Sequence, residues 1–266
     1  MLHWFPGHMH KATKELKKIM PQIDVVIEVV DARAPEATSN PVLHEISVGK
    51  PVIKILSKKD LADPDITNQW LEVYQSKALA FDTLHDKKHL QKIIQLCKKH
   101  TPGRGSILKP IRSVVFGIPN VGKSTLINAL AKRKIAKTGN EPAVTKKQQK
   151  IEIERHFYLN DTPGIMFPSP KDEACGYKLG AIGSIRDTAM DYPSVAYFLL
   201  EYLQVHYKSL LTKRYNIDTD LDLDQMIKAI GQSIGQQNFH TISEKIVQDF
   251  RHGRMGRISL ETPGND

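Results

Sequence analysis

Three short segments of the 266-residue chain carry residues that could bind a nucleotide, and the clearest is GIPNVGKS at residues 117–124. Its glycines allow backbone N–H groups to approach phosphate oxygens, its lysine can neutralise the β and γ phosphates, and its serine can ligate Mg²⁺. A helix beginning directly after the loop would add its dipole to this anion site. We predict phosphate contacts from Asn120, Val121, Gly122, Lys123, Ser124 and Thr125.

The second segment, DTPG at residues 161–164, would complete the phosphate site. Asp161 would hold Mg²⁺ through water, and the N–H of Gly164 would face the γ phosphate. Between the two segments, Thr145 could ligate Mg²⁺ when the triphosphate is bound. The alternative for Thr145 is an ordinary loop hydroxyl.

The third segment, SKKD at residues 57–60, resembles the Asn-Lys-x-Asp loop that reads guanine, with Ser57 where asparagine is expected. Asp60 would accept hydrogen bonds from guanine N1–H and N2–H₂, and the stem of Lys58 would lie along the base. A serine hydroxyl is shorter than an amide and could lose one hydrogen bond, worth roughly 0.5–1.5 kcal/mol. We therefore predict guanine selectivity with weakened affinity. The alternative is four polar residues at the end of a strand.

These segments need a sheet that brings the ends of several strands together. A continuous, largely β-branched run predicts a strand at residues 23–30, and further strands are predicted at residues 51–56, 78–81 and 112–117. Two further strands are predicted at residues 150–153 and 156–159, and helices at residues 66–75, 89–99 and 125–132. This alternation predicts an α/β fold with a doubly wound, mostly parallel sheet.

The carboxyl ends of parallel strands meet at one edge of such a sheet, where nucleotides bind. The early SKKD segment can therefore lie beside the later phosphate loop. Asp82 and Thr83, which follow the strand at residues 78–81, are a predicted second base contact.

The hydrophobic pattern divides the chain into three parts. Residues 1–20 form a basic helical lead-in, and residues 21–175 form the nucleotide-binding domain. Residues 182–266 have helical patterns at 192–211, 223–234 and 242–250, which predict a small all-helical domain.

Composition restricts the partners. The net charge is +9, and residues 87–137 hold thirteen Lys and Arg without one Asp or Glu, which favours a nucleic-acid partner over scattered solvated lysines. Composition alone favours neither RNA nor DNA. Two distant cysteines indicate a reducing compartment and no zinc site. We expect no membrane span and no secretory signal, because no apolar run approaches the ~18 residues that a membrane helix needs.

Several motifs together resemble one family. They are WFPGHM at residues 4–9, DAR-P followed by NP within residues 31–41, GIPNVGKSTLIN, DTPGI, and MGRIS at residues 255–259. On these motifs the chain resembles the YlqF/RbgA family of bacterial ribosome-biogenesis GTPases, whose guanine-binding domain is circularly permuted. The resemblance implies a circularly permuted P-loop GTPase fold followed by a helical RNA-binding or ribosome-binding domain. Permutation explains why SKKD precedes the phosphate loop, since joining the old termini keeps the strand ends together.

The resemblance also implies a function. We expect a cytoplasmic, monomeric GTPase that binds an immature large (50S) ribosomal subunit and its rRNA, and that couples GTP hydrolysis to late assembly of the subunit. GTP or GDP and Mg²⁺ are the expected cofactors, and no DNA partner is expected. K⁺ is a further expected cofactor, ligated by Asn120. Because the switch after DTPG leads into the helical domain, we expect nucleotide state to reorient that domain.

The residues indicate a catalytic group less clearly than they indicate the nucleotide site. Common GTPases place a glutamine after the DxxG motif to orient water, whereas Ile165 stands here. The resemblance assigns this role to a histidine that matches His8. The alternative is that His8 only helps turn the chain into its first helix.

Three other functions remain open at the level of sequence. A GTPase that handles another RNA, for example in tRNA modification, would share the three segments. An ATP-using P-loop enzyme would share two of them. A non-catalytic RNA-binding assembly factor would bind nucleotide without accelerated hydrolysis.

Overall fold

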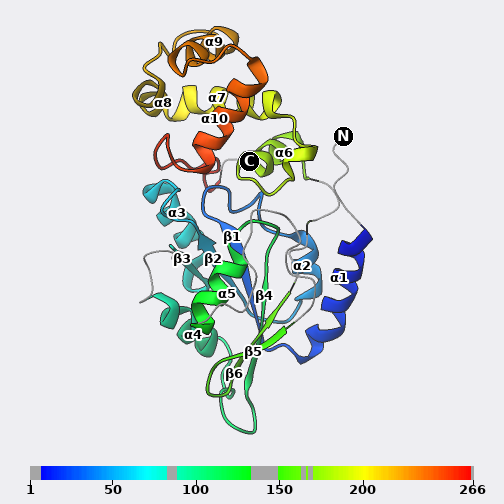
Figure 1. Cartoon of the computed structure of the whole chain (residues 1–266). Coiled ribbons are helices and arrows are strands. Elements are labelled where there is room, and N and C mark those ends of the chain that lie inside the picture. Colours follow the sequence, from blue (N-terminus) through cyan, green and yellow to red (C-terminus); the bar gives the residue numbers. More distant parts are fainter. Residues whose placement is uncertain (1–6, 83–88, 133–148, 163–165, 167–169, 265–266) are drawn as a thin grey trace.

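The structure is a computed structural model of the chain and describes residues 7–82, 89–132, 149–162, 166 and 170–264. A sheet of six strands, in the order β3-β2-β1-β4-β6-β5, forms the centre of its first part (Figure 1). The strands are β1 (Val25–Asp31), β2 (Val52–Ser57), β3 (Ala78–Phe81), β4 (Ile111–Phe116), β5 (Gln149–Glu154) and β6 (Phe157–Asp161). All neighbours pair in parallel except β5 and β6. The predicted doubly wound, mostly parallel sheet is confirmed.

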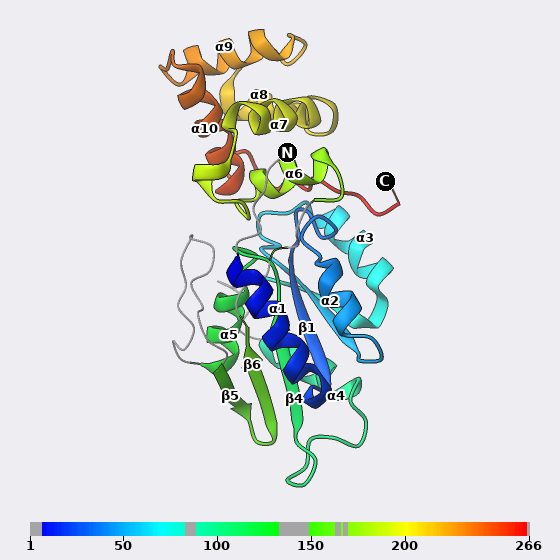
Figure 2. The same cartoon turned by 90° about the vertical axis from the view of Figure 1, so that its right-hand side faces the viewer.

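Helices cover both faces of this sheet. They are α1 (Gly7–Ile19), α2 (Pro41–Ile46), α3 (Pro64–Tyr74), α4 (His89–Lys99) and α5 (Lys123–Ala131). Because side chains alternate along a strand, Val26 and Val30 of β1 pack toward α1, α2 and α3, whereas Val25, Ile27 and Val29 pack toward α4 and α5. Figure 2 shows α1 in front of the sheet and α2 beside it.

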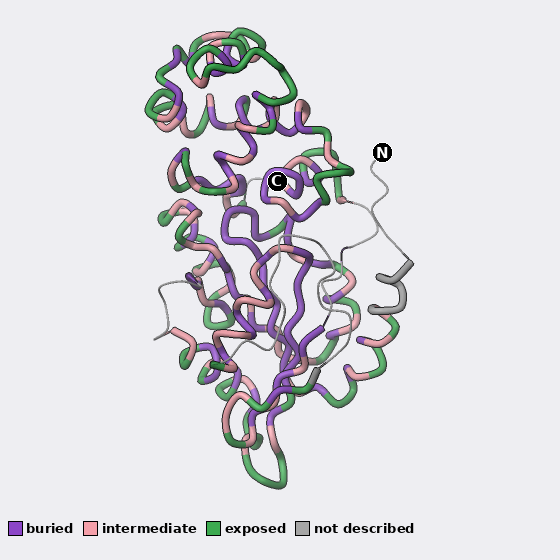
Figure 3. The backbone as a smooth tube through the Cα atoms, viewed as in Figure 1, coloured by how far each residue is buried: buried purple, intermediate pink, exposed green. Residues whose placement is uncertain are grey.

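The central strands β1 and β4 are buried along almost their whole length (Figure 3). Every residue of β1 is buried, including the carboxylate of Glu28. A strand buried on both faces explains why its sequence reads as a continuous β-branched run and not as an alternation.

A helical part lies over the carboxyl edge of the sheet (Figure 1). It comprises α6 (Glu173–Ala181), α7 (Tyr192–His206), α8 (Lys208–Tyr215), α9 (Leu223–Ser233) and α10 (Phe239–Arg251). The predicted helix at 192–211 is divided, because Tyr207 leaves helical geometry at φ −139°, ψ 36° and the chain continues as α8. The short helices α2 and α6 were not predicted, since neither has a long apolar period.

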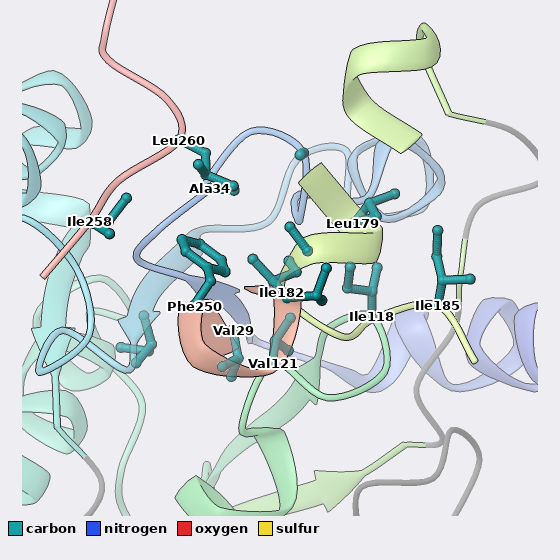
Figure 4. Close-up of a cluster of buried hydrophobic side chains, with 14 of the residues drawn as sticks. Val29, Ala34, Ile118, Val121, Leu179, Ile182, Ile185, Phe250, Ile258 and Leu260 are labelled. Atoms are coloured by element: carbon teal, nitrogen blue, oxygen red, sulfur yellow. The ribbon is translucent and has the colours of Figure 1, made fainter. Parts of the chain in front are cut away.

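Apolar side chains join the two parts. Figure 4 shows Val29, Ala34, Ile118 and Val121 from the sheet and its loops beside Leu179, Ile182, Ile185, Phe250, Ile258 and Leu260 from the helical part and the chain that follows it. All belong to one buried cluster. Burial of this kind, at roughly 25 cal/mol for each Å² of apolar surface, holds the helical part against the carboxyl edge of the sheet.

Candidate nucleotide site

The phosphate loop connects β4 to α5 at the centre of the sheet. A Cβ on Gly117 would come within 2.7 Å of the carbonyl oxygen of Val29, so only glycine allows this close approach to β1. Asn120 and Gly122 have φ of 63° and 89°, in the left-handed region, and Gly122 is the N-cap of α5. These bends wrap the loop in front of the first turn of α5, where backbone N–H groups have no partner within the helix.

Lys123 lies at this helix N-terminus and is buried. Its Nζ donates to the carbonyl oxygen of Thr162 at 2.7 Å and lies 3.6 Å from Oδ1 of Asp161. Burial lowers the pKa of Lys123, although the charge of Asp161 acts in the other direction. Burial also raises the pKa of Asp161, although the charge of Lys123 acts in the other direction. The lysine and the carboxylate of the two predicted phosphate segments therefore meet at one point.

Asp161 also offers a place for a cation. Its Oδ1 is buried and accepts no hydrogen bond within the part of the chain that the structure describes. A water molecule on Mg²⁺ would satisfy this oxygen. The described residues contain no cluster of three or more His, Cys, Asp or Glu that could hold a metal ion without further ligands.

Ser57 ends β2 directly beside the phosphate loop. Its Oγ lies 2.5 Å from the carbonyl oxygen of Val121 and 2.9 Å from that of Val30, and a Cβ on Gly122 would be 3.6 Å from its Oγ. The hydroxyl therefore joins β1, β2 and the phosphate loop. It has a single proton for these two carbonyls.

Lys58 is held by a buried charged cluster. The residue has φ 54°, and its Nζ lies 2.9 Å from Oδ2 of Asp31. Arg33 donates to both oxygens of the same carboxylate at 2.9 Å. Burial alone would raise the pKa of Asp31, but the charges of Arg33 and Lys58 hold it well below its usual range. Burial lowers the pKa of Lys58, and the charge of Arg33 adds to this effect.

The strand register brings the remaining base-site residues to the same edge. Ser57 pairs with Asp31 on one side and with Phe81 on the other, so Asp82 lies next to the SKKD segment. Asp60 is exposed, whereas Asp82 is buried. Ser124 and Thr125 are partly exposed in the first turn of α5.

Other predicted positions lie outside the described residues. They are Thr83, Thr145 and Gly164, together with Ile165. His8 lies in the first turn of α1, where the structure describes the backbone but not the side chain.

The sequence reasoning missed two parts of this site. It gave no role to the buried pair of Asp31 and Arg33, although a charged Asp-x-Arg directly after a buried strand is a signal for such a pair. It also missed the contact of the phosphate loop with the helical part, where Asn120 Nδ2 donates to the carbonyl oxygen of Gly183 at 2.7 Å. Ser184 Oγ donates to the carbonyl oxygen of Pro119 at 2.9 Å. No local sequence pattern predicts these two contacts.

A phosphate loop at the central strand of a parallel sheet, with an Asp-bearing loop on β2 at the same edge, defines the class of P-loop nucleotide-binding proteins.

Residues 112–228 match the family described as "50S ribosome-binding GTPase". Ribosome biogenesis GTPase A of Priestia megaterium is 39% identical over 280 residues, covering 98% of this chain and 97% of the relative. That of Bacillus cereus is 36% identical, covering 99% and 94%. Mitochondrial ribosome-associated GTPase 1 of Xenopus tropicalis is 29% identical, covering 97% and 94%.

The chain belongs to the ribosome biogenesis GTPase A family, which is also named YlqF/RbgA. It is a GTP-hydrolysing enzyme of ribosome assembly. Among solved structures, GDP-bound YlqF has a TM-score of 0.70 at 22% identity, covering 94% of this chain and 100% of that one. GNP-bound YlqF from T. maritima has a TM-score of 0.68 at 24% identity. The predicted family, permuted GTPase fold and enzymatic activity are confirmed.

Proposed function

We propose that this GTPase binds a precursor of the large ribosomal subunit through its rRNA, and couples hydrolysis of GTP to a late step of subunit assembly in the cytoplasm. The observation that carries the proposal is full-length similarity to proteins named ribosome biogenesis GTPase A. The net charge of +9 suits a polyanionic partner. No helix among the described residues is long and apolar enough to cross a membrane.

The charge is unevenly distributed along the chain. Residues 182–266 contain nine Lys and Arg against eleven Asp and Glu, so the whole positive excess lies in residues 1–181. We therefore assign the long-range attraction to rRNA to the GTPase part. The helical part, proposed as the ribosome-binding domain, would then act through shape and specific contacts, since phosphate attraction and specific recognition are separable.

At the nucleotide, we assign the base to Ser57, Lys58, Asp60, Asp82 and Thr83. We assign the phosphates to the N–H of Gly164 and to Asn120, Val121, Gly122, Lys123, Ser124 and Thr125. Lys123 would leave its present acceptor, the Thr162 carbonyl, to reach the β and γ phosphates. Mg²⁺ would be held by Ser124, by Asp161 through water and by Thr145, and it would neutralise charge that develops on the phosphates.

We also assign water positioning to His8 and a K⁺ ligand to Asn120. Both roles concern turnover more than binding. Hydrolysis with ribosomal particles by wild-type protein and by His8→Ala, each in KCl and in NaCl, separates them. We expect His8→Ala to lower stimulated hydrolysis by roughly two orders of magnitude. We expect the wild type to be faster in KCl; equal rates in both salts would remove the K⁺ role.

Co-sedimentation with ribosomal subunits through a sucrose gradient tests the proposed function itself. The protein is run with GDP and with a non-hydrolysable GTP analogue. We expect it in the large-subunit fractions with the analogue and at the top of the gradient with GDP. Absence from the large-subunit fractions in both states would overturn the proposal.

A further inference from the structure

The chain after α10 returns to the nucleotide-binding edge. It turns at Gly253 and Gly256, whose φ values of 68° and 109° lie in the left-handed region. Residues 257–261, RISLE, then run between the loop after β1 and the loop after β2. We call these five residues the strap. In Figure 1 they belong to the red segment between the helical part and α3.

The strap binds the backbone of the loop that follows SKKD. Arg257 Nε donates to the carbonyl oxygen of Ala62 at 2.9 Å, and its Nη2 donates to that of Lys59 at 2.9 Å. Ile258 N donates to the carbonyl oxygen of Leu61 at 3.0 Å. Residues 59–62 are therefore held at three carbonyls by two successive residues from the other end of the chain.

The strap also binds the start of α3, which follows this loop. Ser259 Oγ accepts from the backbone N–H of Asp63 at 3.2 Å, and Asp63 is the N-cap of α3. The backbone N–H of Ser259 in turn donates to the hydroxyl of Tyr207, which lies 3.2 Å from Oδ2 of Asp63. Tyr207 is the residue at which α7 ends, so this junction reaches into the helical part.

The other side of the strap is fixed to the loop after β1. Leu260 N donates to the carbonyl oxygen of Arg33 at 2.7 Å. The carboxylate of Glu261 accepts from the backbone N–H groups of Glu36 and Ala37 at 2.7 and 3.0 Å. Ile258 and Leu260 are each 1% exposed and lie near Ala34 and Phe250 in the buried cluster (Figure 4). The strap is thus a rigid support and not a loose tail.

The supported loop is the one that presents Asp60. Lys58 and Lys59 accept from the backbone N–H groups of Leu61 and Ala62, which forms a tight turn around Asp60. Asp60 is exposed, and the turn fixes the backbone from which its side chain extends. A carboxylate held in the binding geometry before the base arrives loses less conformational entropy on binding.

We propose that the strap, through Arg257, is a positioning element for guanine recognition, and that Arg257 fixes the turn from which Asp60 contacts the base. This rests on the proposed reading of guanine by residues 57–60. Because the strap follows α10 directly, a ligand that moves α10 would change the affinity for guanine nucleotides through the same contacts.

The test uses the full-length protein and two nucleotides, GDP and inosine diphosphate. Inosine lacks the 2-amino group, so the ratio of the two dissociation constants reports how well Asp60 reads the base. In Arg257→Ala we expect this preference for GDP to fall by about threefold to tenfold, as the loss of roughly one positioned hydrogen bond predicts. Arg257→Lys keeps the charge but has one donating nitrogen where Arg257 uses two, so its preference should lie between those of the wild type and the alanine variant.

Arg254→Ala is the matched control. Arg254 is an exposed arginine three positions earlier that pairs with Asp249 of α10, where Arg214 also donates. We expect its GDP preference to be that of the wild type. If Arg257→Ala does not fold, the same ratio of dissociation constants is measured for Arg257→Lys. An unchanged preference in both Arg257 variants, or an equal loss in Arg254→Ala, would overturn the proposal.

Asp60→Asn tests separately whether residues 57–60 recognise guanine, which is the function on which the strap proposal rests. An amide would favour xanthosine diphosphate, because the xanthine base presents a carbonyl where guanine has its amino group. If Asp60→Asn changes the preference toward xanthosine and the Arg257 variants do not change theirs, the base site stands and the role of the strap is overturned. If Asp60→Asn retains guanine preference, the base site itself is wrong and the strap proposal falls with it.

Discussion

Ser57 occupies a buried position at which one hydroxyl proton faces two backbone carbonyls, of Val30 and Val121. An asparagine amide has two N–H donors and could serve both carbonyls while its oxygen remained an acceptor. We expect Ser57→Asn to tighten GDP binding by about threefold to tenfold, equivalent to one hydrogen bond of roughly 0.5–1.5 kcal/mol. Isothermal titration with GDP measures this.

The control for this substitution is Ser57→Ala, which removes the hydroxyl and leaves a carbonyl at the phosphate loop unpaired. We expect it to weaken GDP binding and to lower stability. Weaker binding in both variants would mean that the pocket beside Gly122 cannot accept the larger amide, and that the serine is fitted to this loop.

At the scale of elements, the carboxylate of Glu28 in β1 holds α2 and β2 in place. It accepts from Ser39 Oγ and the backbone N–H of Asn40 at 2.9 and 3.1 Å, and it lies 3.0 Å from Lys54 Nζ. Burial alone would raise the pKa of Glu28, but the hydrogen bond with His44 and the charge of Lys54 lower it to about 2. This carboxylate stabilises the fold while it is ionised.

The pH dependence of stability follows from the lowered pKa of Glu28. Because the pKa is lower in the folded protein than in the unfolded chain, the contribution is complete above the usual pKa of 4.5 and is lost as pH falls toward 2. We expect Glu28→Gln to lower the free energy of unfolding by ~3 kcal/mol at pH 7, and the difference from wild type to shrink below pH 4.5. Urea unfolding between pH 7 and pH 3 measures it.

Glu72→Gln, at an exposed position of α3, is the control for the same change of charge. It should leave the free energy of unfolding within about 0.5 kcal/mol of the wild-type value. A constant difference between Glu28→Gln and wild type across this pH range would show that packing, and not ionisation of Glu28, accounts for its effect.

At the scale of the whole molecule, polar contacts join the nucleotide-binding edge to the helical part and to the strap. The phosphate loop meets Gly183 and Ser184, Arg33 Nη1 donates to the carbonyl oxygen of Arg251 at 3.4 Å, and the strap joins the base-reading turn. The phosphate loop and the loops after β1 and β2 are thus linked to the helical part or to the strap. We expect a change at the γ phosphate to act on the helices through these links.

We expect hydrogen exchange of residues 183–264 to differ between the GDP-bound state and a GTP-analogue-bound state. The largest differences should lie near Gly183 and in the last turn of α10, where the contacts converge. The amides of β1 and β4, which are buried in the sheet, are the internal reference. Equal protection of the helical part in both states would contradict coupling between nucleotide and helical part.

Some features of the protein were determined by the sequence itself. The phosphate loop was readable because its glycine spacing, its lysine and the flanking strand and helix are all local along the chain. Strand β1 was readable because burial on both faces favours a nearly uninterrupted apolar run. The bounds of β3 and α4 coincide with the predicted residues 78–81 and 89–99.

Tertiary structure alone decided the contacts between distant residues. The hydroxyl of Ser57 meets Val121, Arg33 reaches α10, and Arg257 holds the turn beside Asp60, and no periodicity or spacing connects these pairs. Local sequence specifies backbone conformation and the burial of a face, because those depend on neighbouring residues. Which polar groups satisfy one another across the sheet edge depends on how the helical part closes over it, and only the folded chain fixes that arrangement.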